Sequence, residues 1–184
     1  MQLQHHFLLS MPSLGEPNFF SHSLTYICEH DENGAMGLMV NRPLDITVGD
    51  IFVQMEIDPG KLEIAHHRAF QGGPVDQERG FVLHSADVEW ENTLHAGDDI
   101  SVTSSREILE SLADGSGPRD AMIVLGYAAW TAGQLEHELQ QNYWLTCPAS
   151  HEIIFDIGTD KKLNAAAATL GISLSQLSSE VGHA

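Results

Sequence analysis

A turn signal followed by an uninterrupted apolar segment constrains the fold more than any other feature of this chain. Residues 35–40 read AMGLMV, directly after an Asn-Gly pair and directly before Asn-Arg-Pro. Asn-Gly is the strongest short signal for a β-hairpin, and a proline cannot donate to the hydrogen-bond ladder of a sheet. Because apolar residues occupy both alternating sets of positions, we expect a central strand that is buried on both faces.

The rest of the chain predicts more strands and a few separate helices. Strand character, meaning β-branched or aromatic runs bounded by turn residues, occurs at residues 7–11, 24–28, 68–71, 81–84, 100–103 and 122–127. Helices are expected at residues 47–55, 106–113, 132–141 and 161–170. A capping-box spacing occurs from Ser104 to Glu107 and from Thr131 to Gln134. Since strands and helices do not alternate regularly, the sequence predicts an α+β fold with a mainly antiparallel sheet and about four short helices.

Length and charge limit the organisation of the chain and its partners. With 184 residues and no linker, repeat or low-complexity tract, residues 1–184 are expected to form a single domain, with only about the last ten residues loose. The 26 acidic residues outnumber the 8 basic ones, so the formal net charge is −18. Such a charge repels nucleic acids and anionic membranes. The expected partner is therefore an unidentified protein or small ligand, and direct binding to DNA or to a membrane is not expected.

The N-terminus and the cysteines bear on location. Residues 1–12 lack the cationic segment of a signal peptide, and the longest apolar run, residues 121–130, is too short to cross a bilayer. Cys28 and Cys147 lie far apart in apolar surroundings, which is typical of buried thiols in a reducing compartment. A cytoplasmic location is therefore expected.

No strong catalytic signature is present in the sequence. The GxSxG, HExxH, GxxxxGK[ST] and GxGxxG patterns are absent. The pairs His5-His6 and His66-His67 suggest metal binding, but adjacent side chains on a strand point to opposite faces, so neither pair is expected to chelate. Cys28 lacks an evident orienting group and is interpreted as an inert buried thiol. We therefore predict no catalytic residue, no metal site and no cofactor.

Two weaker patterns remain as candidate sites. Gly72 and Gly73 follow a strand within FQGGPV, where their amides can approach a ligand anion, although Gly-Gly-Pro is also ordinary turn chemistry. Trp130 and Trp144 lie close to the junction of a strand and a helix, where aromatic residues either fill the core or form a partner surface. A turn required by packing is favoured for the glycines and a core role for the tryptophans, with the ligand site and the partner surface as the open alternatives.

Several motifs, taken together and in order, resemble those of the bacterial YqgE/AlgH family. They are HHFLLSMP, YICEH…NGAMGLMVNRP, QGGPV…RGFVLHS, TSSREILE, LGYAAWTAGQLEHEL, NYWLTCPA and the terminal GHA. The resemblance implies a small cytosolic bacterial protein whose mostly antiparallel sheet curls towards a barrel. It implies no established reaction, and the family is commonly labelled as candidate transcriptional regulators. Because a direct DNA binder needs a basic face, contact with another protein is the preferred interpretation of that label.

Three functions remain open at this point. The first is a non-enzymatic regulatory or adaptor domain that recognises a protein or a small ligand. The second is an enzyme or sensor for an anionic small molecule, in which Arg42 holds the anion and the glycine amides complete the site. The third, direct regulation of DNA, is ranked last. The candidate ligand-binding residues are Glu29, His30, Asn41, Arg42, Gly72 and Gly73.

Arg42 itself has two interpretations. It follows the predicted central strand and therefore lies where a buried strand reaches the surface. An internal ion pair is favoured, because acidic residues greatly outnumber cations and an unpaired half-buried cation is costly. Contact with a ligand anion is the alternative.

Overall fold

Ten strands form one curled sheet in the computed structural model of this chain, which describes residues 1–15 and 17–175. The path through the sheet is β10-β1-β2-β3-β9-β6-β8-β7, while β4 pairs with β5 and β5 also pairs with β9. The pairing of β5 with β9 is parallel and the others are antiparallel. The strands are β1 (His6–Ser10), β2 (Leu24–Asp31), β3 (Gly34–Met39), β4 (Pro43–Thr47), β5 (Arg68–Gln71), β6 (Val75–Ser85), β7 (Thr93–His95), β8 (Ile100–Thr103), β9 (Ala121–Thr131) and β10 (Trp144–Pro148).

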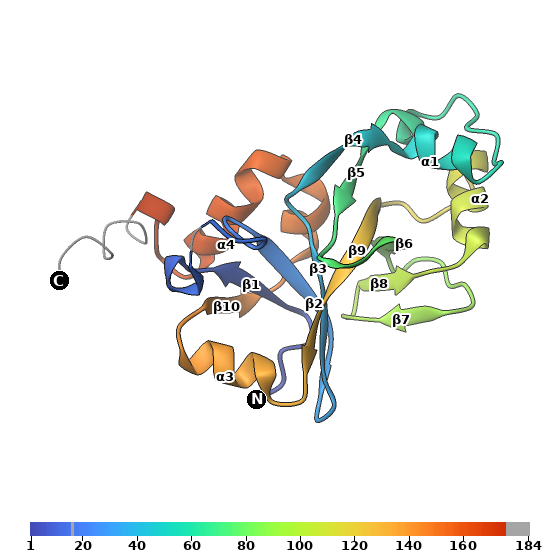
Figure 1. Cartoon of the computed structure of the whole chain (residues 1–184). Helices are drawn as coiled ribbons and strands as arrows, with labels where there is room; N and C mark the ends of the chain where they lie inside the picture. Colours follow the sequence, from blue (N-terminus) through green and yellow to red (C-terminus); the bar gives the residue numbers. More distant parts are fainter. Residues whose placement is uncertain (16, 176–184) are drawn as a thin grey trace.

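Short helices cover both ends of this sheet. Figure 1 shows α3 and α4 beside β1 and β10 at one end of the molecule, and α1 and α2 at the other. The α-helices of the described residues are α1 (Val48–Gln54), α2 (Arg106–Asp114), α3 (Gln134–Gln140) and α4 (Lys162–Thr169). A π-helical segment (Glu152–Asp156) and a 3-10 turn (Thr159–Lys161) precede α4. The predicted α+β fold with a curled antiparallel sheet is confirmed.

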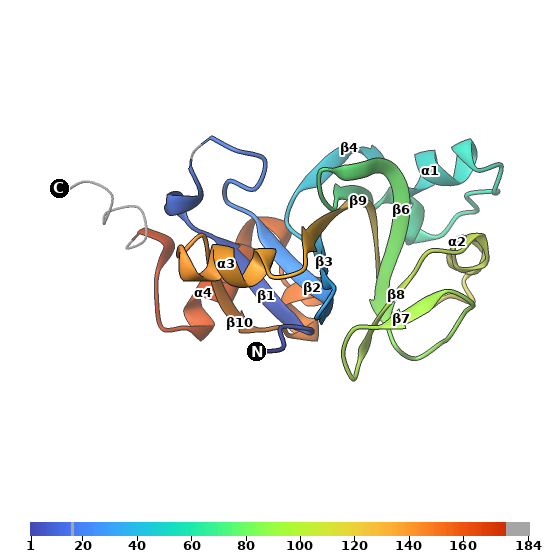
Figure 2. The same cartoon turned by 60° about the horizontal axis from the view of Figure 1, so that its bottom comes forward.

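The long strand β9 joins the two halves of the sheet. Its first part pairs with β5 and β6, and its last part pairs with β3. Between these parts lies Gly126, whose φ of +76° is a conformation that side-chain-bearing residues rarely adopt. Figure 2 shows how strongly β6 bends where it accompanies β9. The sheet therefore changes direction at the middle of β9, and its largest apolar core contains residues of both halves, such as Tyr26 of β2 and Phe81 of β6.

The helices pack against three apolar clusters. Phe52 of α1 and Ile108 of α2 are fully buried against β6 and β9. At the opposite end, Leu135 of α3 packs with the two tryptophans of β9 and β10. Ala166 and Ala167 of α4 are fully buried against the apolar residues of β1 and β2. The small alanine side chains let α4 approach the sheet closely.

The predicted central strand is confirmed as β3, and the segment from Leu38 to Val40 is fully buried. Strands β4, β7 and β10 were not predicted, and β6 and β9 extend beyond the segments expected for them. Neither predicted capping box is complete, although the Gln134 side chain accepts a hydrogen bond from the Thr131 amide at 3.0 Å. The helix α2 begins after Ser105, which makes no side-chain cap, and α3 begins after Gly133. The capping box forms instead at α1, between Thr47 and Asp50.

Two further expectations concern the chain as a whole. In the part of the chain that the structure describes, no helix is long and apolar enough to cross a bilayer. The expectation that the last ten residues are loose concerns residues 176–184 almost entirely, and these lie outside the described residues.

Candidate functional site

The residues selected from the sequence as ligand-binding do not meet in one cleft. His30 lies beside the turn between β2 and β3, whereas Asn41 and Arg42 follow the far end of β3. The Oδ1 atom of Asn41 accepts a hydrogen bond from the Leu24 amide at 2.9 Å. About six residues of extended strand separate Leu24 from His30, which corresponds to about 20 Å. These side chains therefore occupy opposite ends of the hairpin.

His30 and Glu29 belong to different surroundings. Nδ1 of His30 accepts a hydrogen bond from the Leu3 amide at 2.9 Å, and Nε2 lies 2.7 Å from the Glu136 carboxylate. Because both ring nitrogens are engaged, His30 connects the N-terminus, β2 and α3. Glu29 is exposed and lines a shallow hollow of about 250 Å³ together with Asp31. Two carboxylates make that hollow unsuitable for an anion.

Arg42 does not form the expected ion pair with any carboxylate of residues 1–15 or 17–175. Its guanidinium donates hydrogen bonds to the carbonyls of Phe19 and Ser21, the latter at 2.9 Å. It also lies 5.4 Å from the centroid of the Phe19 ring. Burial lowers the pKa of Arg42. The carbonyls supply the hydrogen bonds that a carboxylate was expected to supply, so Arg42 holds the segment before β2 against the end of β3.

Gly72 and Gly73 are required for packing between strands. The Gly72 amide donates to the Leu125 carbonyl at 2.7 Å, and its carbonyl accepts from the Met39 amide at 2.7 Å. A Cβ atom on Gly73 would lie 2.0 Å from the Tyr127 carbonyl carbon. Both glycines are buried. The Gly72 amide is therefore engaged within the sheet and is not available to a ligand anion.

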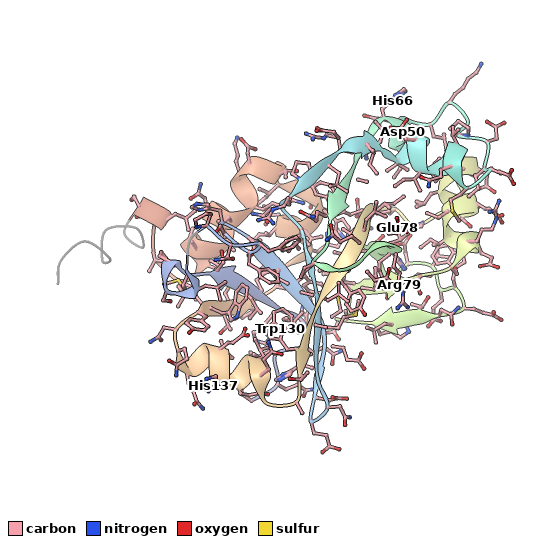
Figure 3. All side chains as sticks on the ribbon, viewed as in Figure 1. Asp50, His66, Glu78, Arg79, Trp130 and His137 are labelled. Atoms are coloured by element: carbon pink, nitrogen blue, oxygen red, sulfur yellow. The ribbon has the colours of Figure 1, made fainter. Side chains whose placement is uncertain are left out.

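Trp130 and Trp144 are buried, with 6% and 3% of their surface exposed, which favours the core interpretation over a partner surface. Trp130 lies between β9 and α3 (Figure 3). Both indole N–H groups donate to the same Oε2 atom of Glu138, each at 2.8 Å. Burial of two large rings around one shared acceptor attaches α3 to the sheet.

The cavity with the most distinctive chemistry lies elsewhere, and we call it the Lys162 cavity. It has a volume of about 480 Å³, within the usual range for small-molecule sites. Its lining residues come mainly from β4, β5, the start of β9, the π-helical segment and the start of α4, and Figure 1 shows where these elements lie. Its apolar walls include Pro43, Val48, Ile64, Phe70, Met122, Ile123, Ile154, Phe155 and Ile157, and its charged or titratable lining residues are His67, Arg68, Arg119, Asp120 and Lys162.

Lys162 is the unusual member of this lining. Only 3% of its surface is exposed, and it forms no ion pair with a carboxylate of the described residues. Its Nζ atom donates to the Val40 carbonyl at 3.0 Å and lies 5.1 Å from the centroid of the Phe70 ring. Burial lowers the pKa of this amine to about 8, because desolvation penalises the charged form. A half-compensated buried cation of this kind suits an incoming anion.

The two arginines of the cavity retain hydrogen-bonding capacity. Arg68 donates to the Leu44 carbonyl and to the Asp45 carboxylate, and Arg119 donates to the Asp120 carboxylate. Their side chains are half or more exposed. Exposed ion pairs are weak, and a guanidinium carries five N–H groups, so each arginine can still donate to a ligand. Three of the eight basic residues of the chain thus line one cavity.

A second cavity, of about 540 Å³, is lined mainly by apolar residues of α1, β6, α2 and β9. Glu78 of β6, labelled in Figure 3, lies on its lining. Its basic residue, Arg106, is tied to Glu110 at 2.7 Å and to the Met55 carbonyl at 2.7 Å. This cavity is larger but has no buried, uncompensated charge among the described residues. Its chemistry therefore points to no particular ligand.

The structure also bears on metal binding and on the reactivity of the Cys28 thiol. No group of three His, Cys, Asp or Glu side chains within residues 1–15 and 17–175 could hold a metal ion. Cys28 is fully buried, its thiol faces the Tyr26 carbonyl, and burial raises the pKa of that thiol. A thiol in this environment is a poor nucleophile, as interpreted from the sequence.

Comparison with known proteins assigns the family. The model of the AlgH-like family matches residues 7–175. The chain belongs to the AlgH-like family.

Relatives of known sequence and structure agree with this membership. A UPF0301 protein of Nitrosospira multiformis is 46% identical over 184 residues, which is 100% of this chain and 98% of that protein. A UPF0301 protein of Pseudomonas fluorescens is 50% identical, covering 99% of this chain and 96% of its own length. The solution structure of the AlgH protein from Pseudomonas aeruginosa is 44% identical, with a TM-score of 0.83 and coverage of 100% and 97%. The AlgH-like fold is therefore established, and the family is one of uncharacterised proteins.

Sequence reasoning missed the Lys162 cavity of this AlgH-like chain because its parts are distant in sequence. Arg68, Arg119 and Lys162 come from a strand, a loop and a helix that only the tertiary fold brings together. One signal was present: Lys162 begins the segment KLNAAAA, which is mostly apolar and therefore suited to burial. The anion site considered from the sequence was therefore assigned to Arg42, Gly72 and Gly73 instead.

Proposed function

We propose that this protein is a regulatory protein without an enzymatic role, and that its input is a small carboxylate with an apolar body bound in the Lys162 cavity. One observation carries the proposal: a buried lysine that pairs with no carboxylate of the described residues lines a cavity of about 480 Å³ whose walls are mostly apolar. Burying a cation costs free energy unless an anion or a set of hydrogen bonds offsets it. A ligand carboxylate supplies the missing counter-charge.

The apolar walls define the rest of the ligand. Phe70, Met122 and Ile154 offer surface to a short aliphatic or aromatic group, and burial of such a group adds about 0.8 kcal/mol per methylene. Arg68 and Arg119 can donate further hydrogen bonds to the carboxylate or to a second polar group. The preferred ligand therefore combines one acidic group with an apolar chain.

Because the net charge of the protein is −18, an anionic ligand is attracted only when it is close to the cations of the Lys162 cavity. At physiological ionic strength charges are screened over about 8 Å, so the cations of the cavity dominate once a ligand is at its mouth. Small anions are therefore accepted, whereas DNA would meet the acidic surface over a wide area. The regulatory role is accordingly assigned to ligand binding in the cytoplasm, followed by contact with a protein partner, and not to direct DNA contact.

The lining also suggests how binding is transmitted. Residues of β4 and β5 form one wall, and residues of the π-helical segment and α4 form the other. A ligand that contacts both walls holds the C-terminal helices against the sheet. Binding thereby stabilises one arrangement of these two parts relative to others.

Calorimetric titration with 4-methylpentanoate tests the proposal, with the neutral 4-methylpentanamide as the paired probe. We expect the acid to bind and the amide to bind at least about tenfold more weakly, since one charge-assisted hydrogen bond contributes about 1.5–3 kcal/mol. The Lys162→Met variant should lose about tenfold in affinity for the acid. Lys161→Met is the matched control, because Lys161 is the adjacent but exposed lysine, and it should bind as the wild type does.

Equal affinity for acid and amide would overturn the proposal, as would a Lys162→Met variant that is folded and binds the acid like the wild type. Binding by an Arg42→Ala variant should remain unchanged, because Arg42 contacts carbonyls outside the Lys162 cavity.

A further inference from the structure

The amine of Lys162 differs from those of the other lysines of the chain in its access to water and in its protonation. Lys61 and Lys161 are exposed, whereas Lys162 is buried and faces the cavity between the Val40 carbonyl and the Phe70 ring. Burial lowers its pKa to about 8, so a substantial fraction of the amine is neutral near pH 7.5. A neutral lysine amine in an apolar pocket is a nucleophile towards carbonyl carbon.

The hydrogen bond to Val40 is compatible with this reactivity. A neutral amine has two N–H groups and one lone pair, and donation of one N–H to the Val40 carbonyl leaves the lone pair free. The cavity that Lys162 lines can receive the electrophile, and the cations Arg68 and Arg119 on the same lining can hold its acidic group. Lys162 and the anion-binding groups therefore line a common space.

We propose that Lys162 captures 2-oxo acids with an apolar side chain as a reversible imine within the Lys162 cavity. This proposal rests on the proposed function and names the ligand class of the same site. A 2-oxo acid has the carboxylate that the cavity accepts, and its adjacent carbonyl group is the electrophile that an amine requires. An aliphatic or aromatic side chain fills the space between Phe70, Met122 and Ile154.

The covalent step balances without any further reagent. The nitrogen lone pair of Lys162 forms a bond to the carbonyl carbon, and a proton moves from nitrogen to the carbonyl oxygen to give a carbinolamine. Loss of that oxygen as water forms the carbon–nitrogen double bond. Asp120 and His67, which line the same cavity, are the groups that can relay the proton. Hydrolysis reverses each step and releases the ligand unchanged.

Reductive trapping tests the imine directly. The protein is incubated with 4-methyl-2-oxopentanoate and sodium cyanoborohydride, and its intact mass is measured. We expect an adduct equal in mass to one ligand less one oxygen atom, and peptide mapping should place it on Lys162, with any adduct of the N-terminal amine counted separately. Modification of Lys162 should exceed that of Lys61 or Lys161 by more than about tenfold, because exposed lysine amines are mostly protonated at this pH.

Two variants separate capture from simple binding. Lys162→Arg keeps the positive charge and should still bind 4-methylpentanoate, but it should form no adduct, because a guanidinium does not form an imine under these conditions. Lys161→Arg should be trapped as the wild type is. Retained binding of 4-methylpentanoate by Lys162→Arg shows that this variant is folded.

Each outcome decides one of the two proposals. If the wild type binds 4-methylpentanoate but yields no adduct, or yields adducts spread evenly over the three lysines, imine capture is wrong and the proposed function stands. If the wild type binds neither the acid nor the 2-oxo acid, both proposals fail.

Discussion

At the scale of single residues, burial without a counter-charge gives Lys162 its chemistry. The amine exchanges a shell of water for one carbonyl at 3.0 Å and the face of one aromatic ring. These contacts only partly replace hydration, so burial costs the charged amine more free energy than it costs the neutral amine. The pKa of Lys162 is lowered for this reason. Arg42 differs from Lys162, because its guanidinium donates to two carbonyls and lies over an aromatic ring. These contacts give Arg42 a structural role.

The Lys162 contribution to stability should rise with pH. The folded protein releases this proton near pH 8, whereas the unfolded chain keeps it until the ordinary lysine pKa near 10.5. Between these values the unfolded state binds more protons, so the free energy of unfolding increases with pH. We expect the difference between wild type and Lys162→Met, measured by urea denaturation, to grow by about 2 kcal/mol from about pH 7.5 to about pH 9.5 in favour of the wild type.

Other groups titrate in the alkaline range but cancel in this comparison. Burial raises the pKa of both Tyr26 and Cys28, which destabilises the folded state as pH rises, and both residues are present in wild type and variant. A difference that is constant with pH, or that shrinks, would show that Lys162 is protonated in the folded protein throughout this range.

Residue roles were the part of the molecule least accessible from the sequence. The sequence indicated that Arg42 needs a partner at the end of a buried strand, but hydrogen bonds to the Phe19 and Ser21 carbonyls depend on the path of a loop. The same holds for Gly72 and Gly73, whose turn chemistry was visible while the close approach of β9 was not. Local patterns indicate that a constraint exists, and the tertiary fold determines which atoms satisfy it.

At the scale of elements, the attachment of α3 depends on one carboxylate. Glu138 accepts both indole N–H groups through Oε2, and its Oε1 accepts from Gln134 at 2.9 Å. The helix is short and has no side-chain cap, so its intrinsic stability is low. Tertiary contacts with Trp130 and Trp144 therefore hold it in place.

Replacing Glu138 should destabilise the protein through the two tryptophans. Glu138→Ala leaves two buried indole N–H groups without an acceptor, and we expect a loss of about 3 kcal/mol in the free energy of unfolding. Glu138→Gln keeps one acceptor oxygen and should lose about half as much. Urea denaturation followed by tryptophan fluorescence measures both. Equal stability of Glu138→Ala and wild type would refute this role.

Elements were predicted well where composition and burial agree. The segments that became β3, β8 and β9 are rich in apolar or β-branched residues, and each strand is largely buried. In contrast, β4 begins with a proline and contains no buried residue, and β7 has three residues, so neither carries a strand pattern. The predicted capping boxes are incomplete because Ser104 and Thr131 each lie one or more residues before the N-cap residue of the helix.

At the scale of the whole molecule, close backbone contact between the segment after β5 and the middle of β9 joins the two halves of the sheet. A Cβ atom on Gly73 would lie 2.2 Å from the Tyr127 carbonyl oxygen, and one on Gly126 would lie 2.6 Å from the Gly73 carbonyl oxygen. Such distances are available only to glycine. The curled shape of the sheet therefore depends on these glycines at its middle.

Gly73→Ala should disrupt this junction, while Gly80→Ala serves as its control. The added methyl group at position 73 collides with backbone atoms that cannot move aside, and we expect a loss of about 3 kcal/mol or more. At position 80 the methyl group meets only the Leu125 side chain at an ordinary 3.6 Å, so the change should stay within about 1 kcal/mol. Thermal denaturation compares the two variants, and similar midpoints would contradict the argument.

The pairing of β1 with β10 has a consequence for biosynthesis. His6 of the first strand lies opposite Pro148 of the last, so one edge of the sheet is completed by residues from nearly opposite ends of the chain. Contacts of such long sequence separation form slowly, because a large loop must close before they are gained. During synthesis on the ribosome, the edge of β1 that pairs with β10 therefore stays unpaired until β10 has emerged. The apolar residues Phe7 to Leu9 stay without that cover for most of translation, and this is the stage at which a chaperone would have most to protect.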